Sequence, residues 1–264
     1  AVKVTDLMPL GDGRADLVRV VEGLEGEVEM EHEWVVRFGY GRIRPWVAHS
    51  PGHKLDDEVI TAIPGNDMLV LRGSRLPRPD GDHHRDRWTV RAGEHYNFST
   101  TWFASYKPIP PPLDISSRLE ATYQRSSEWA SRCTYEGPYR AEVVRSLLTL
   151  RLLTDTRRGG IVAAATTSLP EDFGGVRNWD YRYCWLRDAS LTLESLLKSG
   201  YVGATKLWRD WLVRAIAGSP EDMQIMYAVD GGRELPEREL DHLPGYADSR
   251  PVRVGNGAVN QKQT

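Results

Sequence analysis

Lys107-Pro108-Ile109-Pro110-Pro111-Pro112 divides the sequence into two parts of different character. Proline has a fixed φ and no backbone N–H, so such a run cannot continue a central strand and favours an extended, semi-rigid connection. After it, Asp114 is a suitable N-cap for residues 116–133, in which apolar side chains recur at roughly helical spacing. We therefore expect a Pro-rich linker and a linker helix over residues 107–136.

Residues 1–106, before the proline run, have the pattern of short β-strands. Several runs alternate apolar and polar residues and are separated by Gly, Pro and Asp turn signals. These runs lie at residues 17–22, 28–36, 68–71 and 88–92. Short strands at such spacing indicate an antiparallel β-sandwich, here a partial one, with one face of each sheet in water. The carboxylates of the run EVEME at residues 27–31 then form a solvated sheet face rather than an acidic site.

Residues 137–264, after the linker, have helical periodicity instead. Apolar positions predict helices over residues 137–153, 187–198 and 204–216, and Gly200 closes the second of them. Strands followed by helices imply two domains with separate cores.

Composition excludes several classes of protein. The 34 Lys and Arg against 37 Asp and Glu give a net charge of −3, which argues against binding to nucleic acid through phosphates. No stretch approaches the roughly 20 apolar residues of a membrane span, and no apolar signal segment opens the chain, so we expect no membrane association and a cytoplasmic location. Cys133 and Cys184 are expected to be buried thiols rather than a disulfide or metal ligands.

The aromatic content favours a particular kind of surface. Nine Trp and eleven Tyr stand against four Phe. Trp and Tyr combine a flat apolar face with a hydrogen-bonding tip, and this suits surfaces that are both apolar and wet, such as sugar sites.

One segment concentrates this chemistry: NWDYRYCWLRD at residues 178–188 holds four aromatic and four charged side chains. Charged groups among bulky aromatics are costly to bury unless they are paired, so they form a structural ion network or face a ligand. In the structural interpretation, Arg187 and Asp188 cap the following helix while Arg182 pairs with Asp180.

In the functional interpretation, the same residues recognise a pyranose. An arginine and a carboxylate exchange hydrogen bonds with hydroxyls, and the neighbouring Trp185 and Tyr183 form a wall for the C–H face of the ring. The two interpretations are compatible, because a helix N-terminus can present these groups to a pocket.

Residues 178–189, preceded by TSLPE at 167–171, resemble the first active-site loop of glycoside hydrolase family 15, which contains glucoamylases and bacterial trehalase-like enzymes. RVGNGAVNQ at residues 253–261 resembles the next pocket-lining loop and helix start of that family. Bacterial members also have this domain order: a β-sandwich, a linker helix and an (α/α)6 barrel. The resemblance implies that residues 137–264 are the N-terminal part of the catalytic barrel.

The resemblance also implies roles for individual residues. Arg187 and Asp188 match the pair that holds the non-reducing glucose, with Asp188 accepting from its 4- and 6-hydroxyls. Trp185 and Tyr183 match the aromatic wall. Three further substrate-binding residues carry over from the second loop: Arg253, Asn256 and Gln261. Three residues are expected to lie behind the pocket and orient these groups: Trp179, Asp180 and Arg182.

Family members invert the anomeric carbon, and inversion uses an acid and a base about 6.5–9.5 Å apart. Both are glutamates that lie further along the barrel, and the Gly-Ile-Trp-Glu type of motif that marks the acid does not occur in this sequence. We therefore expect no catalytic carboxylate among the 264 residues and no activity from this chain alone. Glu171, Asp172, Glu194 and the acidic run at 234–239 are interpreted as loop, helix and surface residues.

Residues 137–264 have room for about four of the barrel's twelve helices, so we expect the chain to be an internal piece of a longer enzyme. That enzyme is expected to hydrolyse a terminal α-linked glucose, most simply trehalose, with glucoamylase or isomaltose-type activity as the alternative. If the 264 residues are a whole gene product, a non-catalytic carbohydrate-binding or regulatory protein becomes the better hypothesis. We expect a small carbohydrate as partner and no cofactor or bound metal; a homo-oligomer remains open.

Overall fold

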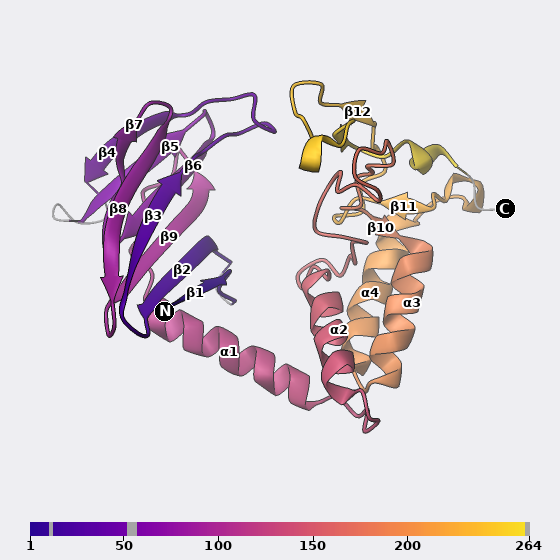
Figure 1. Ribbon diagram of the computed structural model, residues 1–264. Coiled ribbons are helices and arrows are strands. Elements are labelled where there is room, and N and C mark those ends of the chain that lie inside the picture. Colours follow the sequence, from indigo (N-terminus) through magenta and orange to yellow (C-terminus); the bar gives the residue numbers. More distant parts are fainter. Residues whose placement is uncertain (11–12, 52–56, 262–264) are drawn as a thin grey trace. The chain divides into compact units, whose positions relative to one another are not determined.

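The computed structural model describes residues 1–10, 13–51 and 57–261. Contacts divide the chain into two compact units, Ala1–Arg125 and Ser126–Thr264 (Figure 1). The division falls inside helix α1, Ile115–Ser131, which belongs to the segment that we predict to be a linker. Asp114 begins this helix as expected, because its Oδ1 accepts a hydrogen bond from the Ser117 N–H at 3.0 Å.

The first unit is built from antiparallel strands in two sheets (Figure 1). The larger sheet has the order β1-β2-β9-β6-β5-β4 and the smaller one β3-β8-β7. The strands of the larger sheet are β1 (Val2–Leu7), β2 (Ala15–Gly23), β4 (Trp46–Pro51), β5 (Glu58–Ile63), β6 (Asp67–Gly73) and β9 (His95–Ala104). Those of the smaller sheet are β3 (Glu27–Trp34), β7 (Arg78–Asp80) and β8 (His83–Arg91).

The core of this unit lies between the two sheets. Trp88 and Val90 of β8 pack with Val21 of β2 and Phe98 of β9 in one buried cluster, and Trp34 of β3 joins a second cluster with residues of β5 and β6. Side chains from both sheets therefore share one interior. The antiparallel β architecture predicted for the first part of the sequence is confirmed.

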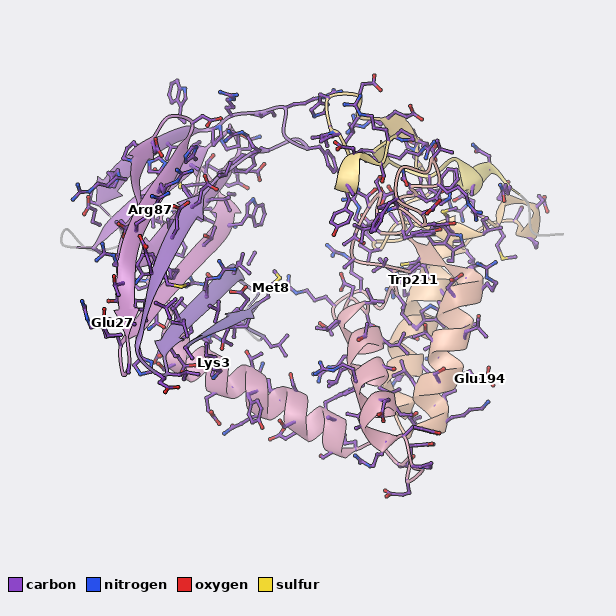
Figure 2. The ribbon with its side chains drawn as sticks, in the orientation of Figure 1. Lys3, Met8, Glu27, Arg87, Glu194 and Trp211 are labelled. Carbon is purple, nitrogen blue, oxygen red and sulfur yellow. The ribbon has the colours of Figure 1, made fainter. Side chains whose placement is uncertain are left out.

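The outer face of β3 carries the predicted solvated carboxylates. The side chains of Glu27, Glu29, Glu31 and Glu33 are exposed. Arginines of the neighbouring strand β8 pair with them: Arg91 Nε lies 3.3 Å from a carboxylate oxygen of Glu27. Arg87 pairs in the same way with Glu31. Figure 2 shows Glu27 and Arg87 along this sheet.

Three α-helices organise the described part of the second unit beyond α1: α2 (Arg140–Leu152), α3 (Leu186–Lys198) and α4 (Val202–Ala215). They match the three predicted helices, and Gly200 closes α3 with a φ of +93°, a conformation that glycine adopts without strain. The helix start that the sequence suggests within residues 253–261 is, in the described residues, a single 3-10 turn over Gly257–Asn260.

The helices share a core with the loops that follow them. Trp211 of α4 is 1% exposed and packs against Cys184 and Tyr227, which lie on the short strands β10 (Cys184–Trp185) and β11 (Met226–Tyr227). A second short pair, β12 (Arg238–Glu239) and β13 (Arg253–Val254), completes the loop region. Among the described residues, no helix is long and apolar enough to span a membrane.

Candidate functional site

The segment that concentrates aromatic and charged residues leads directly into α3. Cys184 and Trp185 pair with β11, and Trp185 is the N-cap residue of the helix, with extended backbone angles of φ −78° and ψ 134°. Arg187 and Asp188 therefore lie in the first helical turn, where a carboxylate interacts favourably with the helix dipole.

The Arg187–Asp188 pair is presented to solvent. An Nη of Arg187 donates to the Asp188 carboxylate at 3.1 Å, and the two side chains are 73% and 42% exposed. The N-cap residue Trp185 makes no side-chain capping hydrogen bond. Both side chains are therefore accessible to solvent at the start of α3.

Asp180 is the buried centre of the segment. Its side chain is 0% exposed and accepts from Arg182 through Nε at 2.9 Å and Nη2 at 2.8 Å. The Gly255 N–H donates to the same carboxylate at 3.1 Å. A forked arginine pair of this kind fixes the orientation of both groups, so the local Asp180–Arg182 pair that the sequence suggested also ties down the second loop.

The two sequence segments meet through further hydrogen bonds. Asn256 donates from Nδ2 to the Asp180 carbonyl at 3.1 Å, and its Oδ1 accepts from the Ala258 N–H at 3.0 Å. The Ser168 hydroxyl accepts from the Arg253 N–H at 2.7 Å. Residues 167–188 and 253–261 thus form one assembly, although about 70 residues separate them in the sequence.

Arg253 lies inside this assembly rather than at its surface. Its guanidinium carbon is 4.6 Å from the centre of the Trp179 ring, and an Nη donates to the Val176 carbonyl at 2.9 Å. Carboxylate oxygens of Glu237 and Glu239 lie 3.5 and 3.4 Å from it. Arg253 and Trp179 therefore hold the two loops together.

A cavity of about 400 Å³ opens between the two loops. It is lined by Trp179, Tyr181, Trp185, Glu237, Asn256, Gly257, Ala258 and Gln261. The rings of Tyr181 and Trp185 are 5.8 Å apart at an angle of 50°. The cavity thus brings together three of the predicted substrate-binding residues, Trp185, Asn256 and Gln261.

The other predicted substrate-binding residues lie elsewhere. Tyr183 packs against the buried cluster that contains Met226 and Leu235, while Arg187, Asp188 and Arg253 do not line the cavity. Trp179 was expected behind the pocket and lies on its wall.

Four wall residues had no predicted role, and two of them, Tyr181 and Glu237, have polar side chains. Tyr181 donates from its hydroxyl to the Glu171 carboxylate at 3.3 Å, and burial, followed by the charge of Glu171, raises the pKa of the Tyr181 hydroxyl. Glu237, which the sequence assigned to a surface run, accepts from the Gly257 N–H at 3.0 Å. The aromatic pattern could have indicated Tyr181, but no local signal marks Glu237.

Comparison with known proteins identifies the family. Residues 137–264 match the model of glycosyl hydrolases family 15. Residues 137–264 belong to this family. Curated relatives include proteins named trehalase. The chain is 34% identical to that of Mycolicibacterium smegmatis and 36% identical to that of Mycobacterium tuberculosis, each over 96% of this chain and 38% of the relative. The trehalase of Thermoplasma volcanium is 32% identical, over 99% of this chain and 41% of the relative.

The family 15 chain thus spans about two fifths of the length of these relatives. Among solved structures, a putative kojibiose phosphorylase from the human microbiome matches with a TM-score of 0.42 and 9% identity, over 88% of this chain and 36% of that one. A TM-score of that size carries no argument about function.

Two carboxylates that the sequence analysis interpreted as loop and helix residues, Glu171 and Glu194, are held in ion pairs. Glu194 projects from α3 (Figure 2) and pairs with Lys198 at 2.6 Å, one helical turn away. Glu171 pairs with Arg177 at 2.9 Å. The described residues contain no cluster of His, Cys, Asp and Glu that could hold a metal ion.

Both thiols of the family 15 chain are free and buried, as predicted. Cys184 is 0% exposed, and burial raises the pKa of its thiol to about 12. The adjacent Trp185 lines the cavity, so the thiol and the site wall share one short strand.

Proposed function

We propose that this chain supplies the glucose-binding part of an inverting enzyme that hydrolyses a terminal α-linked glucose, with trehalose as the first candidate substrate. The observation that carries the proposal is the buried Asp180 carboxylate, which binds Arg182 of one loop and the Gly255 N–H of the other. It holds an aromatic-walled cavity next to the Arg187–Asp188 turn. The similarity to proteins named trehalase favours trehalose.

The proposed roles follow from chemistry. Trp185 and Trp179 offer flat apolar faces to the C–H face of a pyranose. Arg187 and Asp188 are accessible to a sugar, since both side chains are exposed at the start of α3. The Asp188 carboxylate accepts hydrogen bonds from glucose hydroxyls, and the Arg187 guanidinium donates to them. Asn256 and Gln261 supply amide groups from the opposite wall.

The catalytic acid and base of the proposed reaction lie outside this chain, and residues 137–264 form the first part of an (α/α)6 barrel. The described carboxylates support this proposal, since Glu171 and Glu194 are held in ion pairs with arginine and lysine. Water is the nucleophile, and the protein contributes the bound orientation of the sugar.

A hydrolysis screen on the product of the whole reading frame tests this function. Purified protein is incubated with trehalose, maltose, isomaltose and maltotriose, and released glucose is measured. Glucose from trehalose is expected. Release from maltose or isomaltose alone would favour a glucoamylase or isomaltose-type enzyme, and no release from any of the four would overturn the proposal and favour a non-catalytic sugar-binding protein.

The variant Asp188→Ala tests the binding role in the same protein. Loss of two charge-assisted hydrogen bonds to the sugar should lower kcat/KM at least about 100-fold. The thermal midpoint should stay unchanged, because Asp188 is 42% exposed.

The matched control is Asp210→Ala on α4, where Arg209 and Asp210 form the same consecutive pair at 2.8 Å. This control should keep the wild-type rate. Wild-type turnover by Asp188→Ala would refute the assigned role.

A further inference from the structure

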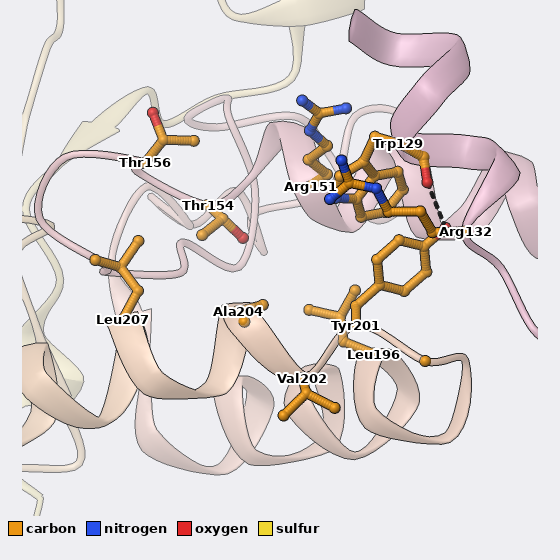
Figure 3. Close-up of a pocket in the computed structure, with 12 residues that line it drawn as sticks. Trp129, Arg132, Arg151, Thr154, Thr156, Leu196, Tyr201, Val202, Ala204 and Leu207 are labelled. Carbon is orange, nitrogen blue, oxygen red and sulfur yellow. Dashed lines mark hydrogen bonds between the residues drawn. The ribbon is translucent and has the colours of Figure 1, made fainter.

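A second cavity, of about 450 Å³, lies in the second unit and shares no lining residue with the candidate site. It is formed by the end of α1, the end of α2 and the loop after it, and the start of α4 (Figure 3). Its apolar part includes Leu196, Ala204 and Leu207. This cavity has no part in the function proposed above.

One wall of the cavity is a rigid stack of flat groups. The rings of Trp129 and Tyr201 are stacked with centres 4.0 Å apart and an angle of 18° between them. The Arg151 guanidinium carbon lies 4.9 Å from the centre of the Trp129 ring. Tyr201 is 6% exposed and donates from its hydroxyl to the Trp129 carbonyl at 3.0 Å, which fixes the stack.

The charges around the cavity have one sign. Arg132 and Arg151 both line it, and its lining, within the described part of the chain, includes no Asp or Glu. Burial, followed by the charge of Arg132, lowers the pKa of Arg151. Two guanidinium groups beside an apolar space repel each other electrostatically, which destabilises the charged form of each. A bound anion would attract both groups and stabilise their charged forms.

Hydroxyl groups and a helix start complete the polar edge. The side chains of Thr154 and Thr156 line the cavity beside the arginines. The first residues of α4, Val202 to Ala204, form the facing wall, and the positive end of a helix dipole adds to the same potential.

We infer that this cavity binds a small organic anion, in which a carboxylate or phosphate group is carried on a flat apolar body. The oxyanion lies between Arg132 and Arg151, where planar guanidinium groups bind such groups through paired hydrogen bonds. The apolar body lies against Leu196, Ala204 and Leu207. A site of this kind, apolar with a few convergent polar groups, has the character of a small-molecule pocket.

Isothermal titration calorimetry on the full chain tests the inference with two probes, phenyl phosphate and benzoate. At least one should bind with a Kd below about 1 mM. Phenol, which lacks the charge, and inorganic phosphate, which lacks the apolar body, should bind at least about tenfold more weakly. The better of the two charged aromatic probes identifies the anionic group.

Two variants locate the binding. Arg132→Gln removes one guanidinium from an exposed position and should weaken the better probe at least about tenfold. Gly203→Leu fills the cavity from α4: a Cβ there meets nothing within 4 Å. It should therefore fold and weaken binding to a similar extent. Arg209→Gln, on the same helix and outside the cavity, is the control and should bind as wild type.

Three results would overturn the inference: no heat from either charged probe at millimolar concentration, equal affinity for phenol or inorganic phosphate, or unchanged affinity in Arg132→Gln. The test does not depend on hydrolytic activity. Failure of the glucosidase proposal would therefore leave this result unaffected.

Discussion

The two units of the molecule use the same ion pairs in opposite environments. On β3 and β8, Glu31 pairs with Arg87 on an exposed sheet face, and the two side chains are 36% and 63% exposed. In the second unit, Asp180 pairs with Arg182, and the Asp180 side chain is 0% exposed. Burial, rather than the presence of an ion pair, therefore decides which charged side chains stabilise the fold.

The physical reason is solvation. Water and salt screen a pair on a sheet surface, and removal of one partner leaves a group that water solvates at once. A buried carboxylate has lost its water, so its removal takes an acceptor from the donors that bind it at a place where bulk water does not replace it. The Asp180 carboxylate has donors on two loops, Arg182 and Gly255.

The largest expected effect comes from Asp180→Ala. Loss of the buried carboxylate should lower the free energy of unfolding by about 3–5 kcal/mol, measured by urea unfolding. Asp210→Ala, which breaks the exposed Arg209–Asp210 pair of the same unit, should leave the unfolding midpoint unchanged. Equal destabilisation by the two substitutions would show that burial does not determine how much an ion pair contributes to stability.

A smaller effect is expected from Gly255→Ala, which perturbs the same junction through the backbone. Gly255 has a φ of +85°, and a Cβ there would lie 2.0 Å from the Pro236 carbonyl oxygen. We expect a loss of about 2 kcal/mol or more in urea unfolding.

The matched control for Gly255→Ala is Gly203→Ala in α4, where the space is open and the residue is helical. This control should raise stability by about 0.5 kcal/mol. A neutral Gly255→Ala would show that the junction tolerates displacement.

The smallest effect concerns a partly buried histidine of the first unit, His32. His32 lies 4.6 Å from the Phe98 ring, and burial, followed by the charge of Arg19, lowers the pKa of His32 from 6.5 despite the opposing charge of Asp86. The unfolded chain therefore binds the proton first as the pH falls. The free energy of unfolding therefore keeps its full value above pH 6.5, the pKa of the histidine in the unfolded chain. It decreases as the pH falls from 6.5 toward the lower pKa of His32 in the folded chain.

Urea unfolding at about pH 7.5 and about pH 5.5 measures this loss, and each unit of pKa difference corresponds to about 1.4 kcal/mol. His32→Gln removes the titrating group and should give a flatter dependence on pH. An equally steep dependence in His32→Gln would assign the effect to other groups, such as His84, whose pKa burial also lowers.

The helices and strands could be predicted from the local pattern of apolar and polar residues. The predicted helix over 187–198 corresponds to α3, Leu186–Lys198, because the apolar period and the glycine at 200 are both local signals. The strand at 28–36 and its exposed carboxylates were predicted for the same reason, since alternation along β3 records which face is buried.

The walls of the candidate site were less predictable. Tyr181, Tyr183 and Trp185 alternate in the sequence, but only Cys184–Trp185 is strand, so the chain does not keep the parity that would place all three rings on one side. Tyr181 and Trp185 line the cavity and Tyr183 does not, although Tyr183 and Trp185 both pack against the cluster of Met226 and Leu235. Glu237 was missed because the N–H that binds it belongs to Gly257, 20 residues away.

The buried thiol of Cys184, which shares strand β10 with the wall residue Trp185, can report on opening of that strand. Cys184 lies at 0% exposure, and burial raises the pKa of its thiol to about 12. An alkylating reagent reacts with the thiolate and needs access to it, so the folded site is inert to such a reagent. Labelling of Cys184 under native conditions therefore reports the opening of strand β10: the labelling rate gives the population of the open form when reclosing is fast, and the opening rate when labelling is faster than reclosing.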